Sequence, residues 1–163
     1  MDFTEKSASM IKPVIISIKG LQSSIDDCKD NNSIEMITSG SYIRKDDGYY
    51  ITYKETEVTG LDGMTTTVHV EGKDKVTLFR AGPMDTHLVF ERGMRHLNHY
   101  ATGFGDLIVG VSAKNIDCNL NDDGGSISVS YVMEVNSTVT SENQFFINIK
   151  ETQFTDDKSF PIS

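Results

Sequence analysis

The sequence lacks long apolar runs and any sign of a targeting segment. Its longest apolar stretches, such as Val14-Ile15-Ile16, have three residues, whereas a membrane-spanning helix needs ~20. Residues 1–6 carry charges of both signs and lead into no apolar segment, which is unlike a secretory signal peptide. We therefore expect a cytoplasmic, soluble protein with no membrane partner.

Cysteine and positive charge are also scarce. Cys28 and Cys118 are the only cysteines and form no CxxC pattern, which excludes a zinc knuckle or a redox motif, and in a reducing cytosol we expect both thiols to be free. Lysine and arginine total 15 against 24 aspartates and glutamates, which gives a net charge of −9. Binding to nucleic acids and anionic membranes begins with a positive field. We therefore expect no nucleic-acid partner.

The composition is that of one globular domain. The chain has 163 residues, of which 37% are hydrophobic and 24% charged, and a chain of this length buries a sizeable core without disulfide or metal support. Residues 1–12 and 151–163 read as tails. The predicted domain therefore spans residues 13–150.

Apolar and polar residues alternate with period two along most of this domain. In the clearest case, from Ile127 to Val135, every second residue is apolar and most of the residues between are polar. This pattern is typical of a strand with one buried face. Such segments occur at residues 14–20, 33–44, 49–58, 64–71, 75–81, 86–92, 95–102, 106–115, 126–135 and 143–150.

Short turns between these segments favour a barrel. Asp and Gly recur there, as in Asp46-Asp47-Gly48 and Gly72-Lys73-Asp74, because Gly adopts positive φ freely and Asp tolerates it. Hairpin-length connections suit an up-and-down meander, and closing it removes the unpaired edges. We predict an all-β fold, a single antiparallel up-and-down β-barrel of about eight to ten strands with little helix. Only the polar segment Leu21–Asn32 suits a helical turn.

A series of short motifs along the predicted barrel carries a resemblance to a known family. They are Thr38-x-Gly40, Tyr50-x-x-Tyr53-x-Glu55, Gly63-x-x-Thr66-x-x-x-Val70, Val76-x-Leu78-x-Arg80-x-Gly82, Met84 through Phe90, Tyr100-x-Thr102-x-Phe104-Gly105, Gly125-x-Ile127-x-Val129-x-Tyr131 and Asn143. In this order and spacing the chain resembles the DUF1934 (YwiB-like) family of small bacterial proteins of unknown function, which is grouped with the calycin-like barrels. The resemblance implies a lipocalin-like barrel, and it brings no enzyme activity.

The patterns of known metal and catalytic sites are incomplete. His96 and His99 are three residues apart in a predicted strand, so their side chains point to opposite faces and cannot chelate one ion. Residues 117–122 begin like a calcium loop, but Asp122 stands where the sixth position requires glycine. No GxSxG motif is present. We expect no metal and no cofactor, and no spacing selects a reaction class.

Three charged residues lie on the apolar faces of their segments. Arg80 and Arg92 are an even number of residues from the apolar positions of segments 75–81 and 86–92, and Glu55 follows Tyr53 with the same parity. Because a one-residue slip would bury the opposite face, we expect all three to point inward. We predict that both arginines reach one barrel opening, with Glu55, Tyr53 and Tyr100 beside them.

These side chains leave several functions open. A buried arginine needs an acceptor, either the Glu55 carboxylate or a ligand anion. If the acceptor is a ligand anion, the protein is a non-enzymatic binding module for a small anionic or amphipathic ligand. The alternative is a packed structural or protein-interaction barrel, a monomer or a homodimer, that uses outward Val89, Leu97 and Phe146. A third is an enzyme with its site at the barrel mouth.

Overall fold

Ten strands make up almost all of the part of the chain that the structure describes. The computed structural model describes residues 11–24, 31–46, 48–59, 62–82, 86–102 and 105–152. The elements are β1 (Lys12–Ser24), β2 (Asn31–Lys45), β3 (Gly48–Lys54), the short 3-10 helix η1 (Glu57–Thr59), β4 (Thr65–Glu71), β5 (Lys75–Ala81), β6 (Thr86–Glu91), β7 (Arg95–Thr102), β8 (Gly105–Asn121), β9 (Gly124–Val135) and β10 (Thr138–Glu151).

The strands form one antiparallel sheet that closes almost completely into a barrel. Their order is β6-β5-β4-β3-β2-β1-β10-β9-β8-β7, so every strand follows its neighbour in sequence and the first strand pairs with the last. The break in the ladder lies between β6 and β7, where an isolated bridge from Arg92 to Ala113 of β8 draws the two ends together. The prediction of an all-β, up-and-down antiparallel barrel is confirmed.

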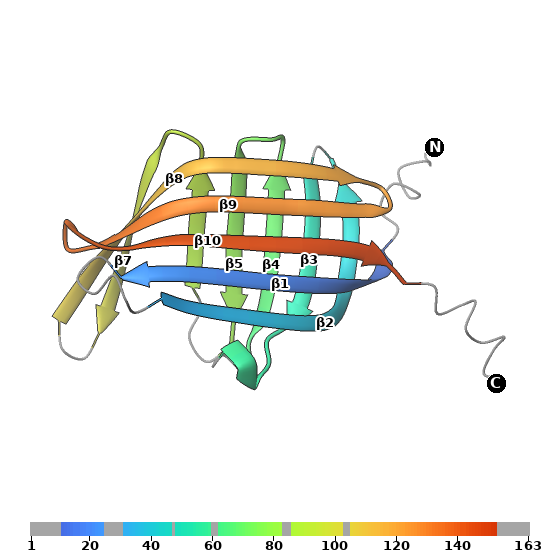
Figure 1. The fold of residues 1–163 in the computed structure, drawn as a ribbon, viewed down its shortest axis with the longest axis horizontal. Helices are drawn as coiled ribbons and strands as arrows, with labels where there is room; N and C mark the ends of the chain where they lie inside the picture. The colour runs from blue at the N-terminus through green and yellow to red at the C-terminus, as the bar shows by residue number, and fades with distance from the viewer. Residues whose placement is uncertain are drawn as a thin grey trace, which may run out of the picture.

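The barrel is flattened into two layers. Figure 1 shows the long strands β1, β8, β9 and β10 crossing in front of the shorter strands β3, β4 and β5. The pairing of β9 with β10 shifts between Val139 and Ser141, and that of β8 with β9 between Ala113 and Asn115. Such β-bulges bend and twist a strand, which helps the long strands to curve around the core.

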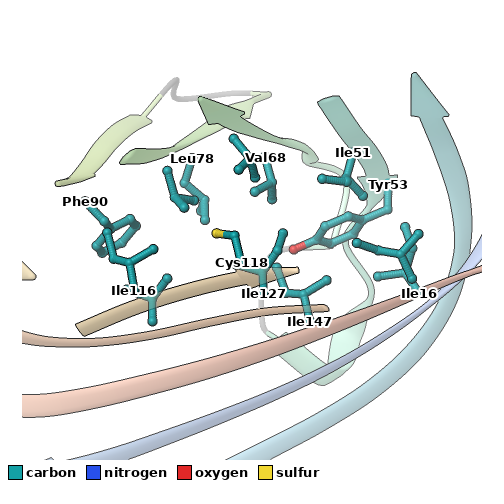
Figure 2. Packing of buried hydrophobic residues seen from close by; sticks show 14 of the residues in the cluster. Ile16, Ile51, Tyr53, Val68, Leu78, Phe90, Ile116, Cys118, Ile127 and Ile147 are labelled. Atoms are coloured by element: carbon teal, nitrogen blue, oxygen red, sulfur yellow. The ribbon is translucent and has the colours of Figure 1, made fainter. Parts of the chain in front are cut away.

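The core lies between the two layers, where one face of most strands is buried. In β4, for example, Thr66, Val68 and Val70 are buried, and the residues between them are only partly covered. Figure 2 shows side chains of the short strands, including Ile51, Val68, Leu78 and Phe90, facing side chains of the long strands, including Ile16, Ile116, Cys118, Ile127 and Ile147. The alternating pattern therefore identified the buried face.

The strand ends differ from the prediction at several places, among them the end of β3 at Lys54 and the start of β10 at Thr138. β8 runs to Asn121, beyond the predicted end at residue 115, because its bulge moves the buried positions from Val111 and Ala113 to Ile116 and Cys118. That change of parity interrupts the alternation in sequence. The helical turn expected at residues 21–32 is wrong for the described part, because residues 21–24 continue β1 and residues 31–32 begin β2.

Helix is almost absent from the part of the chain that the structure describes. Its helical element, η1, has three residues. No helix there is long and apolar enough to cross a membrane. The predicted tails, residues 1–12 and 151–163, lie almost wholly outside the described residues.

Candidate functional site

A polar cluster sits inside the barrel at the end where β3 and β5 finish and β4 begins. Tyr53 of β3, Thr66 of β4 and Arg80 of β5 occupy directly opposed positions across the three strands. Opposed residues share a face of the sheet. Glu55 lies two residues beyond Tyr53, and its amide donates to the Met64 carbonyl oxygen at 2.9 Å, which continues the pairing. Four polar side chains therefore converge on the interior.

Glu55 and Arg80 form an ion pair in this cluster. The Glu55 side chain is 1% exposed, and its Oε2 accepts a hydrogen bond from the Thr66 hydroxyl. Arg80 Nε lies 3.6 Å from the same oxygen, beyond the usual 2.7–3.2 Å of an N–H···O hydrogen bond. Nε is buried and has no hydrogen-bond partner within the described residues. The pair thus neutralises Glu55 but leaves a guanidinium donor unused.

Two tyrosines near Arg80 remain protonated donors. Burial and the neighbouring Glu55 charge raise the pKa of Tyr53, and the Arg80 charge opposes them. Burial likewise raises the pKa of Tyr131 on β9, again against the effect of Arg80. Both phenols therefore keep their protons at neutral pH. The Tyr53 phenol is hydrogen-bonded to Glu55, so Tyr131 is the tyrosine that can donate a hydrogen bond to an anion near Arg80.

A cavity of about 260 Å³ opens beside this cluster, between the two layers. Tyr53, Leu78 and Arg80 contribute one wall, and Tyr131 and Phe145 belong to the other layer. The remaining lining residues are mostly apolar, with three amide side chains among them, and are Ile18, Gly20, Leu21, Gln22, Asn32, Ile34, Gln144 and Ile147. Among the described residues that line the cavity, Arg80 alone carries a charge.

An aromatic cluster contributes Tyr131 and Phe145 to the wall opposite Arg80. The ring centroid of Tyr131 lies 4.7 Å from that of Phe90 and 6.2 Å from that of Phe145, and the two phenylalanine rings are 5.4 Å apart. The rings are tilted or edge-on to one another, the geometry that aromatic groups prefer. A flat apolar group entering the cavity would meet ring faces and edges.

Arg92 does not join the cluster. β5 and β6 are antiparallel, with Arg80 opposite Thr86 and Lys75 opposite Glu91. Arg92 follows Glu91 and therefore lies at the other end of the barrel. The prediction that both arginines reach one opening is wrong, because each lies near the end of its strand and consecutive strands run in opposite directions.

Arg92 instead holds the incompletely closed seam between β6 and β8. Its Nε lies 3.0 Å from Asp74 Oδ1, its Nη1 donates to Asn115 Oδ1 at 3.0 Å, and its Nη2 donates to the Ile116 carbonyl oxygen. The last two acceptors immediately follow the bulge in β8. Arg92 thus links the end of β6 to β8 across the break in the sheet.

We predict that Arg92→Met loosens this seam. We expect a loss of about 1 kcal/mol in the free energy of unfolding, since the side chain is 43% exposed and exposed pairs contribute little. Amide hydrogen exchange in β6 should become faster, because its link to β8 is lost. Arg44→Met, which removes an exposed pair with Asp122, is the control and should leave exchange in β6 unchanged. Unchanged exchange in Arg92→Met would contradict this role.

The remaining predicted residues are placed only in part. Tyr100 lies in β7 opposite Leu107, but its side chain is outside the described residues, so its place near Arg80 stays a prediction. The outward residues Leu97 and Phe146 are exposed and Val89 is partly covered. No two of their strands are paired in the described sheet, so the ladder does not join them into one patch.

Among the residues that the structure describes, metal-binding and nucleophilic groups are not gathered around the cavity. His69 Nδ1 lies 3.5 Å from a Glu71 oxygen, and His96 Nε2 lies 3.1 Å from a Glu91 oxygen. Within the described ranges, no three His, Cys, Asp or Glu side chains come together as metal ligands. Cys118 is buried, and this burial raises its pKa to about 11, so its reactive thiolate is scarce at neutral pH.

Sequence reasoning missed two residues of the site, Thr66 and Tyr131. Thr66 is the middle of three consecutive threonines, and only the pairing register shows that it faces Glu55 and Arg80. Tyr131 has the inward parity of β9, which was visible in the sequence. Its position across the cavity from Arg80 depends on how the two layers pack, which alternation does not give.

The comparisons with known proteins match the barrel and assign it no activity. The profile of the domain of unknown function DUF1934 matches residues 16–147. The uncharacterized beta-barrel protein YwiB of Bacillus subtilis (strain 168) is 28% identical over 138 residues, which cover 80% of this chain and 93% of that protein. The crystal structure of the ywiB protein from Bacillus subtilis aligns with a TM-score of 0.75 and 24% identity over 93% of this chain and 100% of the other, a likeness of fold. Because the profile spans most of the barrel, this chain belongs to the DUF1934 family.

Proposed function

We propose that the protein is a non-enzymatic binding module that holds a small anionic or amphipathic ligand in the cavity beside Arg80. The observation that carries this proposal is the guanidinium of Arg80, the one charged group among the described residues that line the cavity. An anionic group in the cavity could accept charge-assisted hydrogen bonds from this guanidinium.

The character of the cavity supports the same proposal. Small-molecule sites are concave and mostly apolar, with a few polar groups that orient the ligand. This cavity combines an apolar wall with one cation and the phenols of Tyr53 and Tyr131. Its volume of about 260 Å³ is just under the roughly 300–1,000 Å³ typical of ligand pockets. A small ligand fits this description better than a large one.

A packed structural barrel is the second candidate, and the Arg80–Glu55 ion pair favours it. A buried carboxylate needs compensation, and Arg80 supplies it at 3.6 Å. On this reading Arg80 serves Glu55 alone. This reading gives no role to the open space beside Arg80 or to the protonated phenol of Tyr131 that lines it, which is why we favour the binding module.

Native mass spectrometry of the protein purified from the cells that express it tests the proposal. The blocking variant is Gly20→Leu: Gly20 lines the cavity, and a Cβ atom added there meets no atom within 4 Å. The leucine side chain can therefore occupy the cavity at little cost. We expect a retained small molecule in the wild-type protein and none in Gly20→Leu.

Lys19→Leu is the matched control, because Lys19 precedes Gly20 on β1 and its side chain is 52% exposed. This variant adds the same apolar group outside the barrel and should keep the ligand. A wild-type protein without any bound molecule would contradict the proposal. The same ligand retained in Gly20→Leu would contradict it equally, because the molecule would then bind elsewhere.

A further inference from the structure

We infer that the ligand is a small monocarboxylate with a compact apolar body, whose carboxylate binds Arg80 and whose body lies against Tyr131 and Phe145. This inference rests on the proposed binding function and names its ligand class. It follows from the charge, the donor geometry, the volume and the orientation of the cavity.

The charge of the site favours one negative charge on the ligand. Arg80 is the one charged residue among the described residues that line the cavity, and its charge is already shared with Glu55, 3.6 Å from Nε. A second negative charge on the ligand would face the Glu55 carboxylate without a further cation to offset it. Like charges that face one another are unfavourable, and each further negative charge on the ligand adds to this repulsion. A phosphate monoester is therefore disfavoured.

The donors of the site suit a planar carboxylate. A guanidinium presents its N–H groups in one plane, and two of them can bind the two oxygens of a carboxylate together. The phenol of Tyr131 lines the same cavity and stays protonated, since burial raises its pKa. It can supply a further hydrogen bond to the same carboxylate.

The volume and walls of the cavity limit the rest of the ligand. The cavity volume of about 260 Å³ lies just below the roughly 300–1,000 Å³ typical of ligand pockets. A small ligand therefore fits this volume better than a long acyl chain or a nucleotide. The wall near Phe145 is aromatic, with Phe90 and Tyr131 in the same cluster, so a phenyl ring or a branched alkyl group fits there.

The position of Arg80 sets the direction of binding. Its side chain is 27% exposed and it stands beside exposed Ala81 at the end of β5, whereas Leu78 and Ile147 are buried deeper in the barrel. The carboxylate therefore lies at the mouth, and the apolar body points toward the core.

NMR titration of the full-length protein tests the inference with four probes. They are phenylacetate, its neutral isostere phenylacetamide, phenyl phosphate and dodecanoate. We expect saturable shifts of the Tyr131 and Phe145 signals and an affinity for phenylacetate about tenfold or more above that for phenylacetamide, because only the acid forms charge-assisted hydrogen bonds with Arg80.

The double variant Arg80→Met/Glu55→Gln removes both charges of the pair together, so that no buried charge is left unpaired. In this double variant the affinities for phenylacetate and phenylacetamide should become about equal. Arg92→Met, at the other end of the barrel, should retain the full preference. This control separates binding at Arg80 from the general attraction of an anion to a positive charge.

Three patterns of binding would overturn the inferred ligand class. They are equal affinity for the acid and the amide, a preference that survives in the double variant, and tighter binding of phenyl phosphate or dodecanoate. In the last case an anionic or amphipathic ligand still binds, so the proposed function stands while its ligand class is wrong. If no probe causes saturable shifts, the inferred ligand class is also wrong. Native mass spectrometry of the purified protein then decides separately whether the protein binds a small molecule.

Discussion

Arg80→Met should lower the free energy of unfolding by about 3 kcal/mol, the lower end of the range for breaking a buried ion pair from one side. The reason is the environment of Glu55, whose side chain is 1% exposed and would lose its cation. The Thr66 hydroxyl would still donate to the carboxylate, but it carries no charge. The partial exposure of Arg80 keeps the expected loss at the lower end. Urea denaturation followed by circular dichroism measures it.

The double variant Arg80→Met/Glu55→Gln should recover most of this loss. Glutamine can still accept the Thr66 hydrogen bond, and the site no longer holds an unpaired charge. A double variant as unstable as Arg80→Met would show that Arg80 contributes packing rather than charge. An Arg80→Met variant as stable as the wild-type protein would contradict the buried ion pair itself.

Gly125→Ala should cost roughly 4 kcal/mol, because a steric clash adds to backbone strain. Gly125 stands at the start of β9 with a φ of 139°, and a Cβ atom added there would lie 1.9 Å from the Asn119 carbonyl oxygen. That oxygen belongs to the backbone of the paired strand β8, so it can move only by distorting the ladder.

Gly20→Ala is the matched control for this substitution. Gly20 is also a strand glycine, but the added methyl group meets no atom within 4 Å, so the change in stability should stay within about 0.5 kcal/mol. Equal urea midpoints for Gly125→Ala and Gly20→Ala would contradict the close approach of β8 and β9 at this turn.

Much of the fold could be predicted because strand alternation and turn chemistry are local properties. The inward position of Arg80 follows from its even spacing to Val76 and Leu78, since side chains on a strand alternate between two faces. The placement of Arg92 at the opposite end also follows from antiparallel order. The alternation within a single strand shows which face a residue occupies but not at which end of the barrel it lies, so parity alone did not separate Arg92 from Arg80.

The site itself required information that is not local. The row Tyr53, Thr66, Arg80 exists because two turns set the register across β3, β4 and β5. The bulge in β8 reverses the alternation between Ala113 and Ile116, so the pattern in sequence stops where the strand continues. The volume of the cavity depends on how all inward side chains pack, which no single segment determines.

A crystal structure of the protein as purified tests most directly whether the barrel holds a ligand beside Arg80. We predict an open cavity of about 260 Å³ that contains density for a small molecule, with an acceptor atom within about 3 Å of the Arg80 guanidinium, the usual hydrogen-bond distance. An interior closed by the side chains of Tyr131 and Phe145, or an Arg80 guanidinium turned to bulk solvent, would contradict it.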